Sequence, residues 1–256
     1  MKAKHFIVFL LFVGWFCNQA RPQTANPAHV RFQNAIYEAY VQGRMSLWTA
    51  TLRSMESDYA RNPDPALLYD ILLAQYGLIG YYLGTDEPER GEAILERAEK
   101  NLEALARIPK YEVSSLVFDG AFLAFRISLR PIRSVQLGPR SYRRIEQALE
   151  LDENDSRVWI EKGNVAFFTP PIFGGSKSEA ILHYNQAIRL LEKDMPNNHR
   201  WLYLSTLVSL ANAYEKAGDL KSAIEVLEKA LAFEPRFKWV KDEMLPGFKQ
   251  RASDAN

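Results

Sequence analysis

The segment 174–178, which reads GGSKS, is rich in residue types that bind phosphate. A phosphate-binding P-loop needs an adjacent glycine and lysine, a further glycine five residues earlier and a preceding strand. Here Ser176 separates Gly175 from Lys177, and the residues before the segment have a helical pattern. Ser176 and Glu179 instead fit a capping box, in which the serine hydroxyl accepts from a free amide and the carboxylate reaches back. We therefore predict a capped turn between helices and no nucleotide cofactor.

The other candidates for catalysis or metal binding lack a diagnostic spacing. His29, His183 and His199 form no HExxH or similar pair, and the only cysteine, Cys17, lies near the N-terminus. The chain has no GxSxG motif, and acidic pairs are common on solvated helix ends, so neither a Ser-His-Asp enzyme nor a glycosidase is indicated. We expect the histidines at the surface or in a groove. We predict no catalytic residue, no metal site and no cofactor.

Residues 1–20 are predicted to be a secretory signal peptide. Two lysines precede an eleven-residue apolar run from Phe6 to Phe16, which is too short for a permanent membrane anchor. Cleavage after Ala20 fits this pattern, and cleavage after Ala25 is a rival. The residues before Cys17 do not match those of a bacterial lipoprotein, so we do not expect lipid attachment. Without Cys17 the exported chain has no thiol, and helix packing alone must hold it together.

The charge balance selects no general class of partner. Two of the 32 basic residues lie in the predicted signal peptide, which leaves 30 against 31 acidic ones. Such a chain has no global field that attracts nucleic acid or anionic membrane. We expect no nucleic-acid partner, and no stable membrane span after signal cleavage.

Two helices are predicted most clearly within 204–235. Apolar residues recur at three- and four-residue spacing in 204–216 and again in 220–232. Gly218 breaks the run between these segments, and Pro235 ends the second because proline has no amide donor.

This stretch resembles the tetratricopeptide repeat, a 34-residue helical hairpin with bulky, small and proline residues at fixed positions. Counted from Leu204, the matching residues are Leu207, Leu210, Ala211, Tyr214, Ala223, Leu227, Ala230 and Pro235. The resemblance implies an all-α solenoid of about five helix pairs over residues 28–235, after a disordered lead-in at 21–27. A capping helix and tail would follow at 236–256, with the helix interrupted or ended at Pro246 and Gly247.

The remaining pairs show how the repeat varies. The first pair, 28–42 and 45–59, has Trp48 and Met55 where the family prefers alanine, which we attribute to a terminal face without a neighbour. The third and fourth repeats, 113–153 and 156–192, have enlarged turns around 130–139 and 169–176.

Residues 112–190 also resemble a subgroup of exported bacterial repeat proteins, found in Bacteroidetes among others. Three stretches carry this resemblance, LGPRSYRRIEQALELDEND, EKGN and FFTPPIFGGSKSEAI. It implies the periplasm of a Gram-negative bacterium.

The family resemblance also implies a binding groove. The first helices of successive repeats line a concave face, to which positions 2, 5, 9 and 12 point. The corresponding residues are Arg157, Ile160, Asn164, Phe167, Ser205, Val208, Asn212 and Glu215. Asn164 and Asn212 share position 9, where an amide can bond a peptide backbone or a neighbouring helix. Ile160 and Val208 replace the lysine of the family's carboxylate clamp, so we expect no such clamp.

These observations predict a non-enzymatic periplasmic scaffold that binds a protein or peptide on its concave face. Phe167, Phe168 and Phe173 are candidate aromatic anchors, the last two on an enlarged loop. The alternative is a small-ligand-binding accessory protein of a periplasmic transport system, which a deep apolar pocket would favour. An enzyme acting on cell-wall glycan would need convergent carboxylates, and the spacing shows none.

Overall fold

The computed structural model describes residues 27–85, 87–195 and 199–254, so the predicted signal peptide and most of the lead-in lie outside the described residues. Within these ranges the chain is helical and contains no strand, which confirms the all-α prediction. The α-helices are α1 (Pro27–Val41), α2 (Met45–Arg61), α3 (Pro65–Leu83), α4 (Pro88–Leu105), α5 (Glu112–Leu129), α6 (Ser134–Leu151), α7 (Ser156–Phe168), α8 (Lys177–Lys193), α9 (Arg200–Lys216), α10 (Leu220–Phe233) and α11 (Leu245–Asp254). Shorter turns are η1 (Pro109–Tyr111), η2 (Pro131–Arg133), η3 (Pro171–Phe173) and the π-helical η4 (Val240–Met244).

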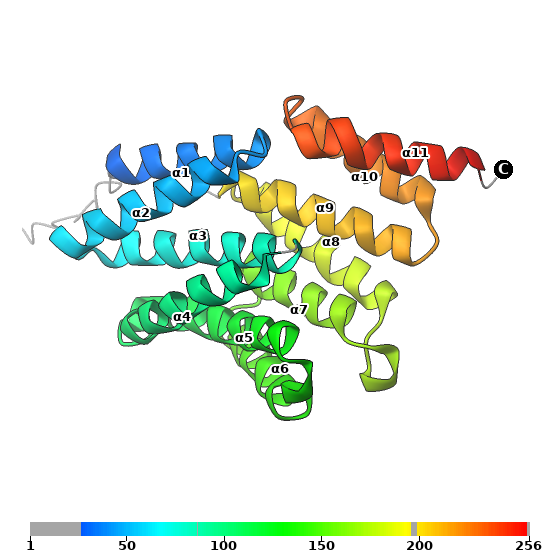
Figure 1. The fold of residues 1–256 in the computed structure, drawn as a ribbon. Helices are drawn as coiled ribbons and strands as arrows, with labels where there is room; N and C mark the ends of the chain where they lie inside the picture. Colours follow the sequence, from blue (N-terminus) through cyan, green and yellow to red (C-terminus); the bar gives the residue numbers. More distant parts are fainter. Residues whose placement is uncertain (1–26, 86, 196–198, 255–256) are drawn as a thin grey trace, which may run out of the picture.

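Consecutive helices pack as hairpins, giving five pairs and a C-terminal cap (Figure 1). Local sequence explains where several helices begin. The side chains of Asp64, Asp155 and Asp219 each accept a hydrogen bond from a first-turn amide, of α3, α7 and α10 respectively. Gly218 has a φ of 86°, a left-handed conformation that glycine adopts without steric cost, and it closes the turn between α9 and α10. The predicted solenoid is therefore present.

Helix α3 is surrounded by other helices. It packs against α1, α2, α4 and α5, and its side chains reach α7 and α9 (Figure 1). By length and composition it is the one helix of the described part that could cross a membrane, but 61% of that window is buried inside the protein. Its apolar character is therefore accounted for by its place in the core.

The first and last hairpins are in contact, because α1 packs against α9. The Tyr37 hydroxyl donates a 2.9 Å hydrogen bond to the Glu234 carboxylate, and the Arg200 guanidinium lies 3.8 Å from the centre of the Tyr37 ring. Arg236 pairs with Glu38 at 3.1 Å. The stack is thus curved strongly enough for its two ends to meet.

The structure corrects our explanation of the divergent first hairpin. Trp48 does not face empty space: its indole nitrogen donates to the Ala74 carbonyl at 3.1 Å, and its ring lies 4.9 Å from that of Trp201. Gly77 provides the space for both indole rings, because a Cβ atom there would lie 2.6 Å from Trp48 and 3.0 Å from Trp201. Met55 is also buried. These large residues pack against neighbours from other repeats.

The enlarged turn predicted at 130–139 is shorter than expected. Helix α5 continues to Leu129, and α6 begins at Ser134 with Pro139 inside it. Proline there leaves the carbonyl of Val135 without its helical donor, but Val135 is exposed, so water can satisfy that carbonyl. The extra residues therefore lengthen α6 more than the turn.

The C-terminal cap continues through Pro246 and Gly247, and the helix does not end there as one of our alternatives required. The π-helical turn Val240–Met244 directly precedes this pair. Such a wider turn accommodates a residue that has no amide hydrogen to donate. Phe237 and Phe248 are buried, as expected for a helix that covers the last repeat.

The contact at Gly77 predicts opposite effects for two glycines of α3. Gly77→Ala would force Trp48 and Trp201 apart and should lower the free energy of unfolding by about 1–3 kcal/mol. Gly80→Ala is the matched control, because nothing lies within 4 Å of a Cβ atom at that position, and it should be neutral or stabilising by up to ~1 kcal/mol. Urea denaturation measures both. Equal shifts of the two midpoints would contradict the proposed packing.

Candidate functional site

The eight residues nominated for the concave face lie on α7 and α9, and the structure divides them into two groups. The members of the inner group contact α1, α3 or the buried side chains between them. They are Arg157, Ile160, Asn164, Ser205 and Val208. The outer group has no described contact with α1 or α3 and consists of Phe167, Asn212 and Glu215.

The inner residues of α7 face helix α3. Arg157 forms an ion pair with Asp155 and donates a 2.7 Å hydrogen bond to the Tyr69 hydroxyl of α3. Its guanidinium lies 5.1 Å from the centre of the Tyr69 ring. Ile160 is 5% exposed and lines a small hollow together with Tyr76. Ile160 is therefore inaccessible to a partner in this conformation, and the Arg157 guanidinium is already engaged by Asp155 and Tyr69.

The inner residues of α9 are occupied by helix α1 and the core. Ser205 shares a hydrogen bond with the Tyr40 hydroxyl. Burial raises the pKa of Tyr40 to about 12 against the lowering effect of this bond, so the hydroxyl is neutral near pH 7. Val208 is 5% exposed and belongs to the main core.

A buried polar network surrounds Glu161, a residue that our sequence analysis missed. The Tyr76 hydroxyl donates to the Glu161 carboxylate at 2.6 Å, and the Asn164 amide donates to it at 3.1 Å. The Asn164 carbonyl oxygen accepts from the Tyr184 hydroxyl at 2.8 Å. Asn164 therefore makes the helix–helix hydrogen bonds that were one of our two alternatives. The signal available in the sequence was an acid three residues before this asparagine.

The environment of Glu161 changes its proton affinity. Burial raises the pKa of this carboxyl to about 7, although the hydrogen bonds from Tyr76 and Asn164 act in the opposite direction. The pKa of Tyr76 is also raised well above its usual range. Burial is the larger cause, and the nearby Glu161 carboxyl is the second. One buried group of this face therefore changes charge near neutral pH.

The outer group leaves more of its polar atoms available. Asn212 is half-buried and makes no hydrogen bond to any described residue. Glu215 pairs with Lys216 at 3.2 Å and with Arg251 of α11 at 3.5 Å. Phe167 is partly buried, with the Lys177 ammonium 4.3 Å from its ring centre. Whether these three residues bind a partner stays a prediction.

The two loop candidates are exposed. Phe168 ends α7 and is 74% exposed, while Phe173 ends the η3 turn and is 70% exposed. Both lie at the edge of the fourth hairpin, in the turn between α7 and α8 (Figure 1).

His29 is buried and His199 is half-buried, whereas the sequence led us to expect both at the surface or in a groove. His29 is 9% exposed, with Nε2 3.1 Å from the Asp64 carboxylate, and His199 Nε2 lies 3.4 Å from that of Asp70. Gln33 donates to Asp70 at 3.1 Å. An aspartate inside the otherwise apolar α3 was the signal for this cluster. Its geometry is that of paired side chains, and the described part of the chain holds no group of three or more residues arranged to bind a metal.

Two small hollows lie inside the stack. One is lined by residues of α1, α2, α3 and α9 and the other by residues of α3, α5, α7 and α9. Each has a volume of about 10 Å³. A hollow of this size holds about one water molecule, so neither accommodates an organic ligand.

The family comparison agrees with the repeat pattern. Residues 204–237 match the model of the tetratricopeptide repeat, which confirms the resemblance that we drew from that stretch. Proteins built from this repeat are generally non-enzymatic scaffolds that mediate protein–protein interactions. A comparison of the sequence with curated proteins gave no match.

Two solved structures have a similar fold. A thermophilic tetratricopeptide-repeat protein of Thermus thermophilus shares 17% identity with a TM-score of 0.54, over 89% of this chain and 98% of that one. The haemophore HusA of Porphyromonas gingivalis shares 16% identity with a TM-score of 0.52, over 77% of this chain and 96% of its own. At these identities the likeness shows the fold alone.

The raised pKa of Glu161 predicts a stability that falls as pH rises. Between about pH 4.5 and 7 the folded protein retains a proton that the unfolded chain has lost, so the free energy of unfolding decreases across this window. Glu161→Gln should remove this contribution and be more stable than wild type at pH 8, by on the order of 1–3 kcal/mol.

Urea denaturation at pH 5 and pH 8 tests this prediction. The exposed Glu150→Gln serves as the control and should follow wild type at both pH values. If the difference between Glu161→Gln and wild type were the same at pH 5 and pH 8, Glu161 would not titrate in this window.

Proposed function

We propose that this tetratricopeptide-repeat protein is an exported, non-enzymatic adaptor that binds a protein or peptide on the outer part of its concave face. The outer group, Phe167, Asn212 and Glu215, would contact the partner. The apolar segment at the start of the chain supports export, and the resemblance of residues 112–190 supports a Gram-negative periplasm.

One observation carries this proposal: the concave face already binds a segment of polypeptide, its own helix α3. The inner residues of α7 and α9 contact α3 and α1 through apolar packing, an arginine on a tyrosine ring and buried hydrogen bonds. These are the contacts by which helical grooves recognise peptides. The outer group lies on the same two helices, past the part that α3 covers. It therefore extends a surface that already packs against polypeptide.

The three outer residues offer complementary contacts. Phe167 supplies a partly buried ring, the type of residue that anchors interfaces. The half-buried Asn212 amide can donate to and accept from a peptide backbone. Glu215 pairs with Lys216 at 3.2 Å and with Arg251 at 3.5 Å, and its carboxylate would also accept from a basic or amide-rich segment of a partner.

The second candidate function is small-ligand binding as a transport accessory. It is supported by the similarity in fold to HusA, which is a haemophore. The two hollows of about 10 Å³ count against a ligand held inside the stack. A ligand of that kind would have to bind between molecules or on the outer surface, and this places the candidate second.

The proposal predicts that Phe167→Ala/Asn212→Ala loses a specific partner. Chemical crosslinking followed by capture from the native envelope should recover one reproducible protein with wild type, and at least about tenfold less with the double variant, since two interface contacts are typically worth more than 1.4 kcal/mol together. The control is Glu225→Ala, an exposed residue on α10, the second helix of the same repeat.

Asn164 is left unchanged in this experiment because its replacement would break the buried network with Glu161. Equal recovery by wild type and the double variant would refute the proposed surface. A small molecule that copurifies with wild type in place of a protein would favour the second candidate.

A further inference from the structure

Two neighbouring turns expose apolar side chains that the groove proposal does not use. Between α5 and α6, Ile132 of the η2 turn is 91% exposed, and Val135 at the start of α6 is 83% exposed. In the turn between α7 and α8, Phe168 is 74%, Ile172 85% and Phe173 70% exposed. We call these five residues the rim. A group of large apolar side chains that are this exposed to solvent commonly marks an interaction site.

Both turns lie at the same edge of the molecule. Helices α6 and α7 run side by side, with an ion pair between Glu146 and Lys162 and with the Lys162 ammonium 5.9 Å from the Tyr142 ring. Since the chain turns back between them, the start of α6 and the end of α7 face the same side of the stack. Figure 1 shows both turns at the lower side of the stack, apart from each other in this view. The rim therefore consists of two turns, from consecutive repeats, on one side of the molecule.

The turn between α7 and α8 holds its apolar side chains in a fixed position. A Cβ atom on Gly175 would lie 1.7 Å from the Thr169 carbonyl oxygen, so only glycine fits this closed turn. The Ser176 amide donates to the Ala166 carbonyl at 2.9 Å, and the Lys177 ammonium donates to the Phe167 carbonyl. Exposure of the rim is thus a property of an ordered turn.

The two segments that carry the rim are rich in basic residues. Residues 121–145 contain six arginines and no acidic residue, and residues 162–178 contain two lysines and no acidic residue. This local excess contrasts with the near-neutral balance of the whole chain. An edge with this composition attracts an anionic surface.

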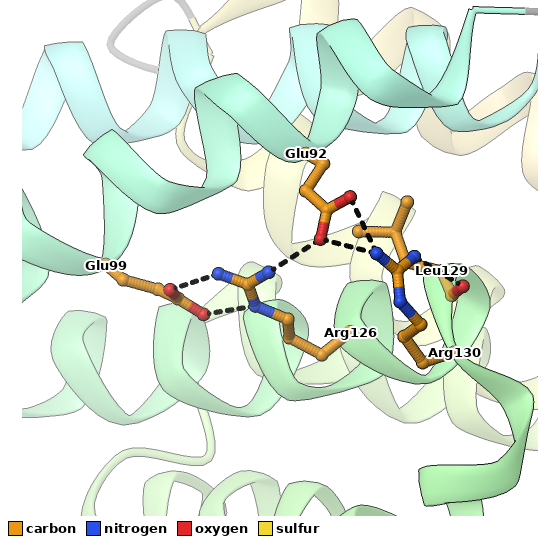
Figure 2. Close-up of polar contacts among 5 residues, drawn as sticks. All are labelled: Glu92, Glu99, Arg126, Leu129 and Arg130. Atoms are coloured by element: carbon orange, nitrogen blue, oxygen red, sulfur yellow. Dashed lines mark hydrogen bonds and ion pairs between the residues drawn. The ribbon is translucent and has the colours of Figure 1, made fainter.

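Part of this charge is structural. Arg126 pairs with Glu99 at 2.6 Å and with Glu92 at 3.3 Å, and Arg130 pairs with Glu92 at 3.1 Å, as Figure 2 shows. These ion pairs connect the end of α5 to α4. The two arginines therefore fix the position of the residues that lead into the turn between α5 and α6.

Of the other four arginines, Arg144 pairs with Asp119 of α5 at 2.6 Å, and three are free to interact. Arg133, Arg140 and Arg143 are exposed and have no ion pair with any described residue. They lie on η2 and on the first three turns of α6, the segment that also carries Ile132 and Val135. Free cations therefore adjoin the protruding apolar side chains.

We propose that the rim docks the protein onto the surface of a bilayer that contains anionic phospholipid. The five apolar side chains would enter the boundary between headgroups and acyl chains, and the three free arginines would bind lipid phosphates. Protruding side chains flanked by cations suit a soft, negatively charged interface better than the hollowed surface of a protein. This inference concerns a different surface from the proposed partner site and does not rest on it.

Fluorescence at the rim tests the proposal directly. Cys17→Ser/Ile172→Cys, labelled with the environment-sensitive dye nitrobenzoxadiazole and isolated as the exported chain, should shift to shorter wavelength on vesicles of phosphatidylcholine and phosphatidylglycerol. Cys17→Ser/Leu182→Cys is the control, because Leu182 is 67% exposed but lies on α8, outside both turns. Its spectrum should not change.

Cosedimentation then separates the contribution of charge. Binding should be at least tenfold weaker to phosphatidylcholine alone and should weaken as salt is raised. Arg140→Gln/Arg143→Gln should weaken it at least fivefold, whereas Lys238→Gln/Lys241→Gln, an exposed pair on the C-terminal cap, should not. Circular dichroism verifies that the variants are folded.

Three outcomes would overturn the proposal. They are an unchanged spectrum at position 172, equal binding to neutral and anionic vesicles, and equal losses for the arginine and lysine pairs. If position 172 crosslinks to an envelope protein and does not respond to vesicles, the rim is a protein-docking surface.

Discussion

The close approach of α3 to the tryptophans of two other hairpins is the constraint on which the rest of the structure depends. At Gly77 the helix has no side chain, and Trp48 of α2 and Trp201 of α9 meet there with their rings 4.9 Å apart. Because α3 is apolar on nearly every side, each of its buried leucines and isoleucines favours the wrapped arrangement by about 1.5–3 kcal/mol. The curvature that brings α1 to α9 follows from covering this helix.

Polar side chains fix which way α3 faces. Gln75 is fully buried, donates to Glu56 of α2 and accepts from Asn101 of α4, each at 3.1 Å. Asp70 accepts from α1, and Tyr76 donates to α7. A buried polar group without a partner costs about 1–3 kcal/mol, so a rotation of α3 would break several of these bonds together. The burial of apolar side chains therefore makes the stack compact, while these hydrogen bonds determine the rotation of α3 about its own axis.

The sequence predicted the local structure well and the long-range packing poorly. Helix positions follow from apolar spacing and from caps such as Ser176, whose hydroxyl accepts from the Glu179 amide at 3.2 Å. The second half of that capping box is absent from the described bonds, because the Ser176 amide donates to Ala166. Asn164 and Asn212 share one repeat position, yet only Asn164 is reached by Tyr76. The position of a residue in the repeat specifies which face of its helix it occupies. Whether another helix covers that face depends on the rotation angles between successive hairpins, summed over several repeats, and no single repeat encodes that sum.

The strong curvature also determines where recognition can occur. In an open solenoid the inner face is free, but here α1 and α3 occupy much of it and leave Phe167, Asn212 and Glu215 beyond their reach. The longer α6 of the third repeat and the enlarged turn of the fourth add surface at the edge, where the packing of α3 imposes no limit. The ion pairs of Arg126 and Arg130 with α4 anchor one of these turns, which lets exposed apolar residues be held there without loosening the stack. The burial of α3 therefore has two consequences: the inner face of the stack is largely occupied, and added surface lies at its edge.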